Sequence, residues 1–127
     1  MNKLLLSLTV VLIASLAFGQ SVKKMNISDL EAYIKQSEKP LVVNFWATFC
    51  KPCIEEIPYF QNTIKEKYDG LVDLVLVSLD LPEYFPYRLS YFGTQKNISV
   101  PIVWLNETNA DYFCPKIDMK WSGAIPA

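Results

Sequence analysis

Three short stretches of the chain consist mainly of apolar residues, at residues 41–47, 72–79 and 100–105. Their β-branched and aromatic side chains favour strands, and the first two have the composition of strands buried on both faces. Between these two, apolar residues recur at steps of three and four, which is typical of one helix face: Ile57, Phe60, Ile64 and Tyr68. A strand, a helix and a strand in this order predict two parallel strands joined by a right-handed crossover.

Capping and turn residues mark the ends of the expected helices. Ser28 and Glu31 have the spacing of a capping box, which predicts a short helix that ends near residue 36. Pro52 suits the first turn of the longer helix, Pro58 should kink that helix, and Gly70 should end it. Two further short helices are expected at residues 84–96 and 109–118. The order of these elements indicates one domain of the α/β class.

The first 19 residues have a different composition from the rest of the chain. Lys3 is followed by an uncharged apolar run, with the small residues Ala17 and Gly19 at its end, which is the pattern of a secretory signal peptide. An uncleaved membrane anchor is the less favoured alternative, because a spanning helix needs ~20 apolar residues and this run is shorter. We therefore expect a signal peptide at residues 1–19, a domain at residues 20–127, and export of the protein.

Composition and charge exclude several classes of function. Twelve basic and 13 acidic residues leave a net charge of −1, so no basic surface is expected and no nucleic-acid partner. The chain has no histidine, which excludes Ser-His and Cys-His catalysis and any histidine metal site. It has three cysteines, fewer than the four ligands of a structural zinc site, so no metal is expected.

Two of the cysteines form the motif Cys50-Lys51-Pro52-Cys53, directly after a predicted buried strand and at the start of a predicted helix. Cys50 would lie at the helix N-terminus, where free N–H groups and the helix dipole favour a thiolate. The thiolate of Cys50 could attack a disulfide, and Cys53, one turn further, could resolve the mixed disulfide. A purely structural disulfide is the less favoured alternative. Cys114 is interpreted as a buried apolar residue.

From Asn44 to Cys53, and on to Pro58, the sequence resembles the thioredoxin superfamily, and most closely its exported TlpA/ResA branch. The resemblance implies a thioredoxin-like fold with a central, mostly parallel sheet flanked by helices. It implies a thiol–disulfide oxidoreductase, mostly reducing and without a cofactor, in the periplasm or on the outer face of the cytoplasmic membrane. The implied partners are exported proteins with thiols or disulfides, apocytochrome c among them, and a membrane conduit of reducing equivalents as electron donor.

The resemblance assigns roles to single residues. Cys50 matches the nucleophile and Cys53 the resolving thiol of the redox-active disulfide. Glu56 matches a glutamate that exchanges the proton of the second thiol, with a solvated helix charge as the alternative. Trp46 matches a tryptophan beside the active site, with an ordinary core position as the alternative. Asn44 stands where cytoplasmic thioredoxins have a buried aspartate.

The family also has a cis-proline that faces the dithiol. Pro101 and Pro126 are the candidates, and Pro126 is preferred because residues 121–127 resemble the cis-proline segment of the branch. Ile125 and Pro126 would then bind substrate. Beyond this proline the family has two antiparallel strands and a helix, which we expect to be missing, since one residue follows Pro126. A second interpretation therefore stays open: an incomplete thioredoxin-like domain without turnover, with at most a binding or structural role.

Overall fold

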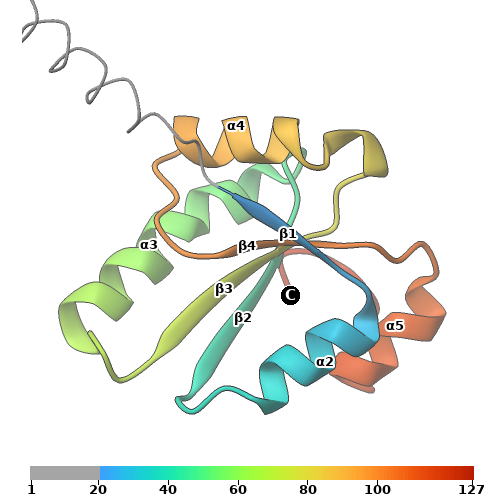
Figure 1. Cartoon of the computed structure of the whole chain (residues 1–127), viewed down its shortest axis with the longest axis horizontal. Coiled ribbons are helices and arrows are strands. Elements are labelled where there is room, and N and C mark those ends of the chain that lie inside the picture. The colour runs from blue at the N-terminus through green and yellow to red at the C-terminus, as the bar shows by residue number, and fades with distance from the viewer. Residues whose placement is uncertain (1–20) are drawn as a thin grey trace, which may run out of the picture.

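The computed structural model describes residues 21–127, so the predicted signal peptide at residues 1–19 lies outside the described residues (Figure 1). Four strands form one parallel sheet in the order β1-β4-β3-β2: β1 (Val22–Met25), β2 (Leu41–Trp46), β3 (Asp73–Ser78) and β4 (Ile102–Leu105). The helices of this part of the chain are α2 (Ile27–Lys35), α3 (Lys51–Lys67), the short 3-10 helix η1 (Pro82–Tyr84), α4 (Tyr87–Gln95) and α5 (Ala110–Ile117). Within residues 21–127, no helix has both the length and the apolar composition needed to cross a membrane.

Helices cover both faces of the sheet, because successive side chains of a strand point to opposite faces. On one face, Leu74 and Leu76 of β3 belong to a buried cluster with α3 and α4. On the other face, Val75 and Val77 belong to a second buried cluster with α2 and α5. Figure 1 shows these two helix pairs on either side of the sheet. This arrangement confirms the predicted α/β, thioredoxin-like fold.

The strands β2, β3 and β4 lie within the three apolar stretches of the sequence. β2 and β3 are parallel neighbours, with Val43 opposite Val75, as the strand, helix and strand order predicts. The connecting helix α3 continues through Pro58 and is followed by Gly70, whose φ of +73° suits glycine. Helices α4 and α5 also lie within the expected stretches.

The expected N-cap of the first described helix is wrong by two residues. Asn26 is the N-cap of α2, and its side chain accepts a hydrogen bond of 2.8 Å from the backbone N–H of Asp29. The Asp29 carboxylate accepts one of 3.2 Å from the backbone N–H of Asn26, which completes a capping box. Ser28 lies inside the helix and is exposed to solvent.

Strand β1 was not expected from the sequence. Two of its four residues are lysines, and both are exposed, so the segment carries no apolar signal of its own. It forms because β4 offers a parallel edge, with Val22 opposite Ile102 and Met25 opposite Leu105.

Candidate active site

The two cysteines of the motif lie where β2 ends and α3 begins. Cys50 is the N-cap of α3, and Cys53 lies in the first turn, one residue after Pro52. The two sulfur atoms form a disulfide, and the Cα atoms are 5.3 Å apart, which is an ordinary separation for a disulfide. The fixed φ of a proline suits the first turn of a helix, so the sequence favours this start of α3 locally.

The helix terminus gives the two sulfur atoms different surroundings. The backbone N–H of Cys53 donates a hydrogen bond of 3.3 Å to Sγ of Cys50. The same N–H can stabilise a thiolate on Cys50 when the disulfide is open, and the helix dipole acts in the same direction. Cys50 is 7 % exposed and Cys53 is 1 % exposed, so Cys50 is the more accessible of the two. The geometry therefore suits Cys50 as the attacking sulfur and Cys53 as the resolving one.

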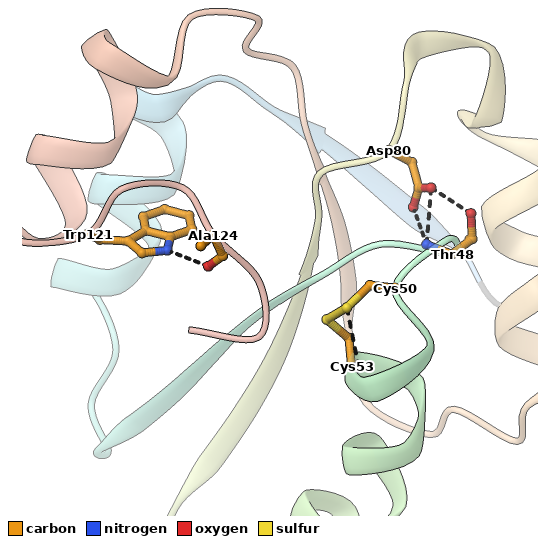
Figure 2. The surroundings of a disulfide bond; sticks show 6 residues. All are labelled: Thr48, Cys50, Cys53, Asp80, Trp121 and Ala124. Atoms are coloured by element: carbon orange, nitrogen blue, oxygen red, sulfur yellow. Dashed lines mark hydrogen bonds between the residues drawn. A yellow bond between two sulfur atoms is a disulfide. The ribbon is translucent and has the colours of Figure 1, made fainter.

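A buried carboxylate holds the loop that leads to Cys50. Asp80 follows β3, and it accepts hydrogen bonds from the backbone N–H and the hydroxyl of Thr48 (Figure 2). Sequence reasoning missed Asp80. The available signal was its place: polar residues that follow neighbouring parallel strands meet at one edge of the sheet, and this edge also carries the dithiol.

Trp46 is a core residue at the end of β2. Its side chain is fully buried in the same cluster as Cys50 and Cys53, and its ring centroid lies 5.5 Å from that of Phe92. These contacts are those of a core residue. A role of Trp46 in substrate binding, as the resemblance implies, would therefore act through the residues that cover it.

Two polar atoms of β2 are buried without a hydrogen-bond partner. They are Oδ1 of Asn44 and Nε1 of Trp46. Buried polar atoms of this kind are uncommon, because the lost hydrogen bond to water is not replaced. Asn44 thus places a neutral amide, whose oxygen has no hydrogen-bond partner, where the resemblance puts a carboxylate in cytoplasmic thioredoxins.

The C-terminal segment reaches the same cluster. The Ile125–Pro126 peptide bond is cis, as preferred from the sequence, whereas Val100–Pro101 is not one of the cis bonds. Phe85–Pro86 is also cis, and this was not predicted. The half-buried Ile125 packs against the cluster that contains the dithiol, while Pro126 is exposed. Ile125 also packs against the cluster on the other face of the sheet, and the substrate-binding roles of Ile125 and Pro126 stay predictions.

Trp121 fixes this segment against the sheet. Its ring centroid lies 4.4 Å from that of Phe45, and its Nε1–H donates a hydrogen bond of 2.9 Å to the carbonyl oxygen of Ala124 (Figure 2). Gly123 has a φ of +90°, and a Cβ atom there would lie 3.3 Å from Sγ of Cys114. Only glycine adopts this backbone conformation easily, so the sequence Ser-Gly-Ala favours the observed path locally.

The two glutamates that follow Cys53 have different environments. Glu55 is exposed and lies 3.8 Å from the ammonium of Lys51, so it is a solvated charge. Glu56 is half-buried and lines an apolar groove of about 670 Å³, together with Val42 of β2 and Phe60 of α3. Glu56 lies three residues after Cys53, on a neighbouring position of the same helix. Its predicted role in proton exchange is compatible with this place and stays a prediction.

The surroundings of Cys114 differ from those of the two motif cysteines. Its thiol is buried, and this burial, with the negative charge of Asp111 as a smaller cause, raises its pKa above the ordinary value. A protonated, buried thiol is a poor nucleophile. Within the described residues, no three Cys, Asp or Glu side chains lie close enough together to hold a metal ion.

Comparison with known proteins identifies similar proteins that are named thiol-disulfide oxidoreductases or thioredoxin-like proteins. Residues 15–110 match the AhpC/TSA family. The thiol-disulfide oxidoreductase ResA of Oceanobacillus iheyensis is 43% identical over 56 residues, which are 44% of this chain and 26% of the relative. The thioredoxin-like protein YneN of Bacillus subtilis is 35% identical over 75 residues, 58% of this chain and 44% of the relative. A ResA of Halalkalibacterium halodurans is 29% identical over 89 residues, 67% of this chain and 49% of the relative. The chain thus spans a quarter to a half of the length of these curated relatives.

Proposed function

The chain belongs to the AhpC/TSA family as a ResA-like member of the thioredoxin superfamily, and from this premise we propose that it is a protein thiol–disulfide oxidoreductase that acts as a reductant. One observation carries the proposal. The more exposed sulfur, on Cys50, caps α3 and accepts a hydrogen bond from the N–H of Cys53, which is the geometry that activates a thiolate. Two proteins that the chain is similar to, from Oceanobacillus iheyensis and Bacillus subtilis, are named thiol-disulfide oxidoreductase ResA.

The reaction moves two electrons from the dithiol to a disulfide of the substrate protein. The thiolate of Cys50 attacks one substrate sulfur, the substrate S–S bond breaks, and the other substrate sulfur leaves as a thiolate that takes up a proton. Cys53 loses its proton, for which Glu56 is the acceptor in this proposal, and attacks Sγ of Cys50. The mixed disulfide breaks, the substrate leaves as a dithiol, and the Cys50–Cys53 disulfide forms. A second dithiol protein must then reduce this disulfide again.

The direction of electron flow and the location are parts of the same proposal. The residues between the cysteines, Lys51 and Pro52, lack the histidine found in strong oxidants of the family, which favours a reductant. Residues 1–19 have the pattern of a signal peptide, which favours a role in the periplasm or on the outer face of the cytoplasmic membrane. Exported proteins with disulfides, apocytochrome c among them, are then the substrate class, and a membrane conduit of reducing equivalents is the electron donor.

Reduction of insulin disulfides by the chain from Gln20 onward, with dithiothreitol as the electron source, tests the proposal. We expect turnover well above that of dithiothreitol alone, and a loss of at least about a hundredfold in Cys50→Ser, because the nucleophile is gone. Cys53→Ser should accumulate a mixed disulfide with the substrate. Cys114→Ser is the matched control and should keep its activity.

Two outcomes would contradict the proposal. One is a Cys50→Ser variant as active as the unaltered chain. The other is a cooperatively folded chain that reduces insulin no faster than dithiothreitol does. The second outcome would favour the alternative interpretation, a thioredoxin-like chain that binds a partner without turnover.

A further inference from the structure

The side chain of Asp80 is a buried carboxylate that has no part in the reaction proposed for the dithiol. Its side chain is 4 % exposed, and it follows β3 by two residues. Within residues 21–127, the ion pairs are Lys39 with Asp73 and Lys51 with Glu55, so no cation compensates the charge of Asp80. A buried, unpaired carboxylate is costly unless several donors surround it. The donors that surround Asp80 therefore identify what this residue holds.

Three donors meet the carboxylate, and two of them belong to one residue. The backbone N–H of Thr48 lies 3.1 Å from both Oδ1 and Oδ2, and the Thr48 hydroxyl donates a hydrogen bond of 2.6 Å to Oδ1. The Ser78 hydroxyl donates one of 2.7 Å to Oδ2. The backbone of Asp80 is itself fixed, because Nε1–H of Trp104 donates a hydrogen bond of 2.8 Å to its carbonyl oxygen. Asp80 is thus a rigid acceptor aimed at Thr48.

Thr48 lies in the turn that delivers Cys50 to the helix. The backbone N–H of Cys50 donates a hydrogen bond of 3.0 Å to the carbonyl oxygen of Ala47, which closes this turn over residues 47–50. In Figure 2, Thr48 lies between Asp80 and Cys50. The turn lies in no strand or helix. It is stabilised by its own hydrogen bond from Cys50 to Ala47 and by the hydrogen bonds from Thr48 to the Asp80 carboxylate.

We propose that Asp80 is a positioning residue of the dithiol, which holds the 47–50 turn through Thr48 so that Sγ of Cys50 stays within hydrogen-bond reach of the Cys53 N–H when the disulfide is open. In the oxidised protein the disulfide itself fixes Cys50. After reduction this covalent restraint is gone, and the turn alone decides where Sγ lies. The inference rests on the proposed function only in that the dithiol is the reactive group.

The negative charge of Asp80 and its hydrogen bonds to the turn have opposite effects on the ionisation of Cys50. A nearby negative charge disfavours a thiolate, whereas a fixed turn favours the thiolate by keeping the Cys53 N–H in place. Substitution of Thr48 separates the two effects, because Thr48→Val removes the hydroxyl donor and leaves the carboxylate. Thr48→Ser keeps the hydroxyl. Ser37→Ala is the matched control, because it removes a hydroxyl hydrogen bond of 2.7 Å to the carbonyl oxygen of Lys39 and leaves both Asp80 and the 47–50 turn untouched.

The test measures the rate at which iodoacetamide alkylates Cys50 in the reduced protein, as a function of pH, with the site of alkylation identified by mass spectrometry. We expect Thr48→Val to shift the pH profile upward and to slow alkylation near neutral pH about threefold to tenfold, the effect of one lost hydrogen bond. Thr48→Ser should restore the profile to within about twofold. Ser37→Ala should leave the profile unchanged. Asp80→Leu should also shift the profile upward, because its side chain has no acceptor for the Thr48 N–H and hydroxyl.

Three results would overturn the inference. They are an unchanged profile in Thr48→Val, an equal shift in Ser37→Ala, and a downward shift in Asp80→Leu, which would assign Asp80 a purely electrostatic influence. The readout needs no protein substrate. If insulin reduction failed while these shifts were observed, the proposed function would be wrong and the role of Asp80 would stand.

Discussion

At the scale of single residues, the three cysteines divide into two kinds of environment. Cys50 has a helix terminus and a backbone donor beside its sulfur. Cys114 has an apolar shell and the negative charge of Asp111, and its pKa is raised, mainly by burial. The first environment favours a thiolate and the second favours a thiol. Cys114 should therefore affect the stability of the fold at high pH and leave the redox reaction unaffected.

The raised pKa of Cys114 predicts a loss of stability in alkaline solution. In the unfolded chain this thiol ionises near its ordinary pKa of 9.0, while in the folded protein its pKa is higher and it stays protonated to higher pH. Between these two values the unfolded state binds fewer protons, so the free energy of unfolding falls as pH rises, by at most about 1.4 kcal/mol per pH unit. Urea unfolding from pH 7.5 to 10, with the dithiol kept oxidised, measures this slope.

Cys114→Ala is the matched variant for that measurement. It should be less stable near neutral pH, because a buried side chain is shortened, and its stability should fall less steeply with pH. All other titratable groups are the same in both proteins, so the difference between the two slopes isolates Cys114. Equal slopes would show that Cys114 ionises alike in the folded and unfolded chains.

The reactive residues could be predicted from the sequence because their chemistry is local. Two cysteines three residues apart, after an apolar strand and with a proline between them, place one sulfur at a helix N-terminus without any long-range information. Asp80 could not be recognised in this way, because its contact with Thr48 joins residues that are 32 positions apart. It becomes visible only when β2 and β3 are known to be neighbours and their carboxyl ends to share one edge.

At the scale of helices and strands, the start of α2 shows how two local signals compete. Asn26 with Asp29 and Ser28 with Glu31 both have capping-box spacing. The first box is used because Ile27 is then the first helical residue, and it is 1 % exposed in the core. A distant residue supports the same choice, since Oε1 of Glu107 accepts a hydrogen bond of 3.0 Å from the N–H of Ile27. Core packing therefore decided between two equivalent patterns.

This choice predicts a clear difference between two alanine variants. Asn26→Ala should lower the free energy of unfolding by about 1 kcal/mol, because the backbone N–H of Asp29 loses its acceptor. Ser28→Ala should change it by less than about 0.5 kcal/mol, because Ser28 is an exposed residue inside the helix. Urea denaturation followed by circular dichroism measures both. A larger loss in Ser28→Ala would mean that the helix begins at the other box.

The strands also differ in whether their own residues or a distant part of the chain determines them. β3 and β4 are apolar and are buried along most or all of their lengths, so their composition alone predicted them. β1 has two exposed lysines and gains its structure from β4, whose partner residues lie about 80 positions further along the chain. No short-range pattern could indicate β1, since what stabilises it is a sheet edge that another part of the chain provides.

At the scale of the whole molecule, the sheet order places β2, the strand that precedes the dithiol, at an edge. β2 pairs with β3, and among residues 21–127 no strand lies on its other side. Beside this edge lies the apolar groove of about 670 Å³ between β2 and α3, which Val42, Phe60 and Glu56 help to line. Unpaired N–H and C=O groups next to an apolar surface are a template for pairing with another chain. The edge therefore bears on the solution state of the domain.

We expect the chain from Gln20 onward to self-associate through β2, with an average mass in sedimentation equilibrium that rises with protein concentration. Val42→Lys should keep the mass nearer that of the monomer, because it places a charge in the apolar groove at the edge. Gln95→Lys adds the same charge at an exposed position of α4, away from β2, and should behave as the unaltered chain does. Circular dichroism must show that both variants are folded. A mass independent of concentration, or an equal effect of Gln95→Lys, would show that the β2 edge does not pair between molecules.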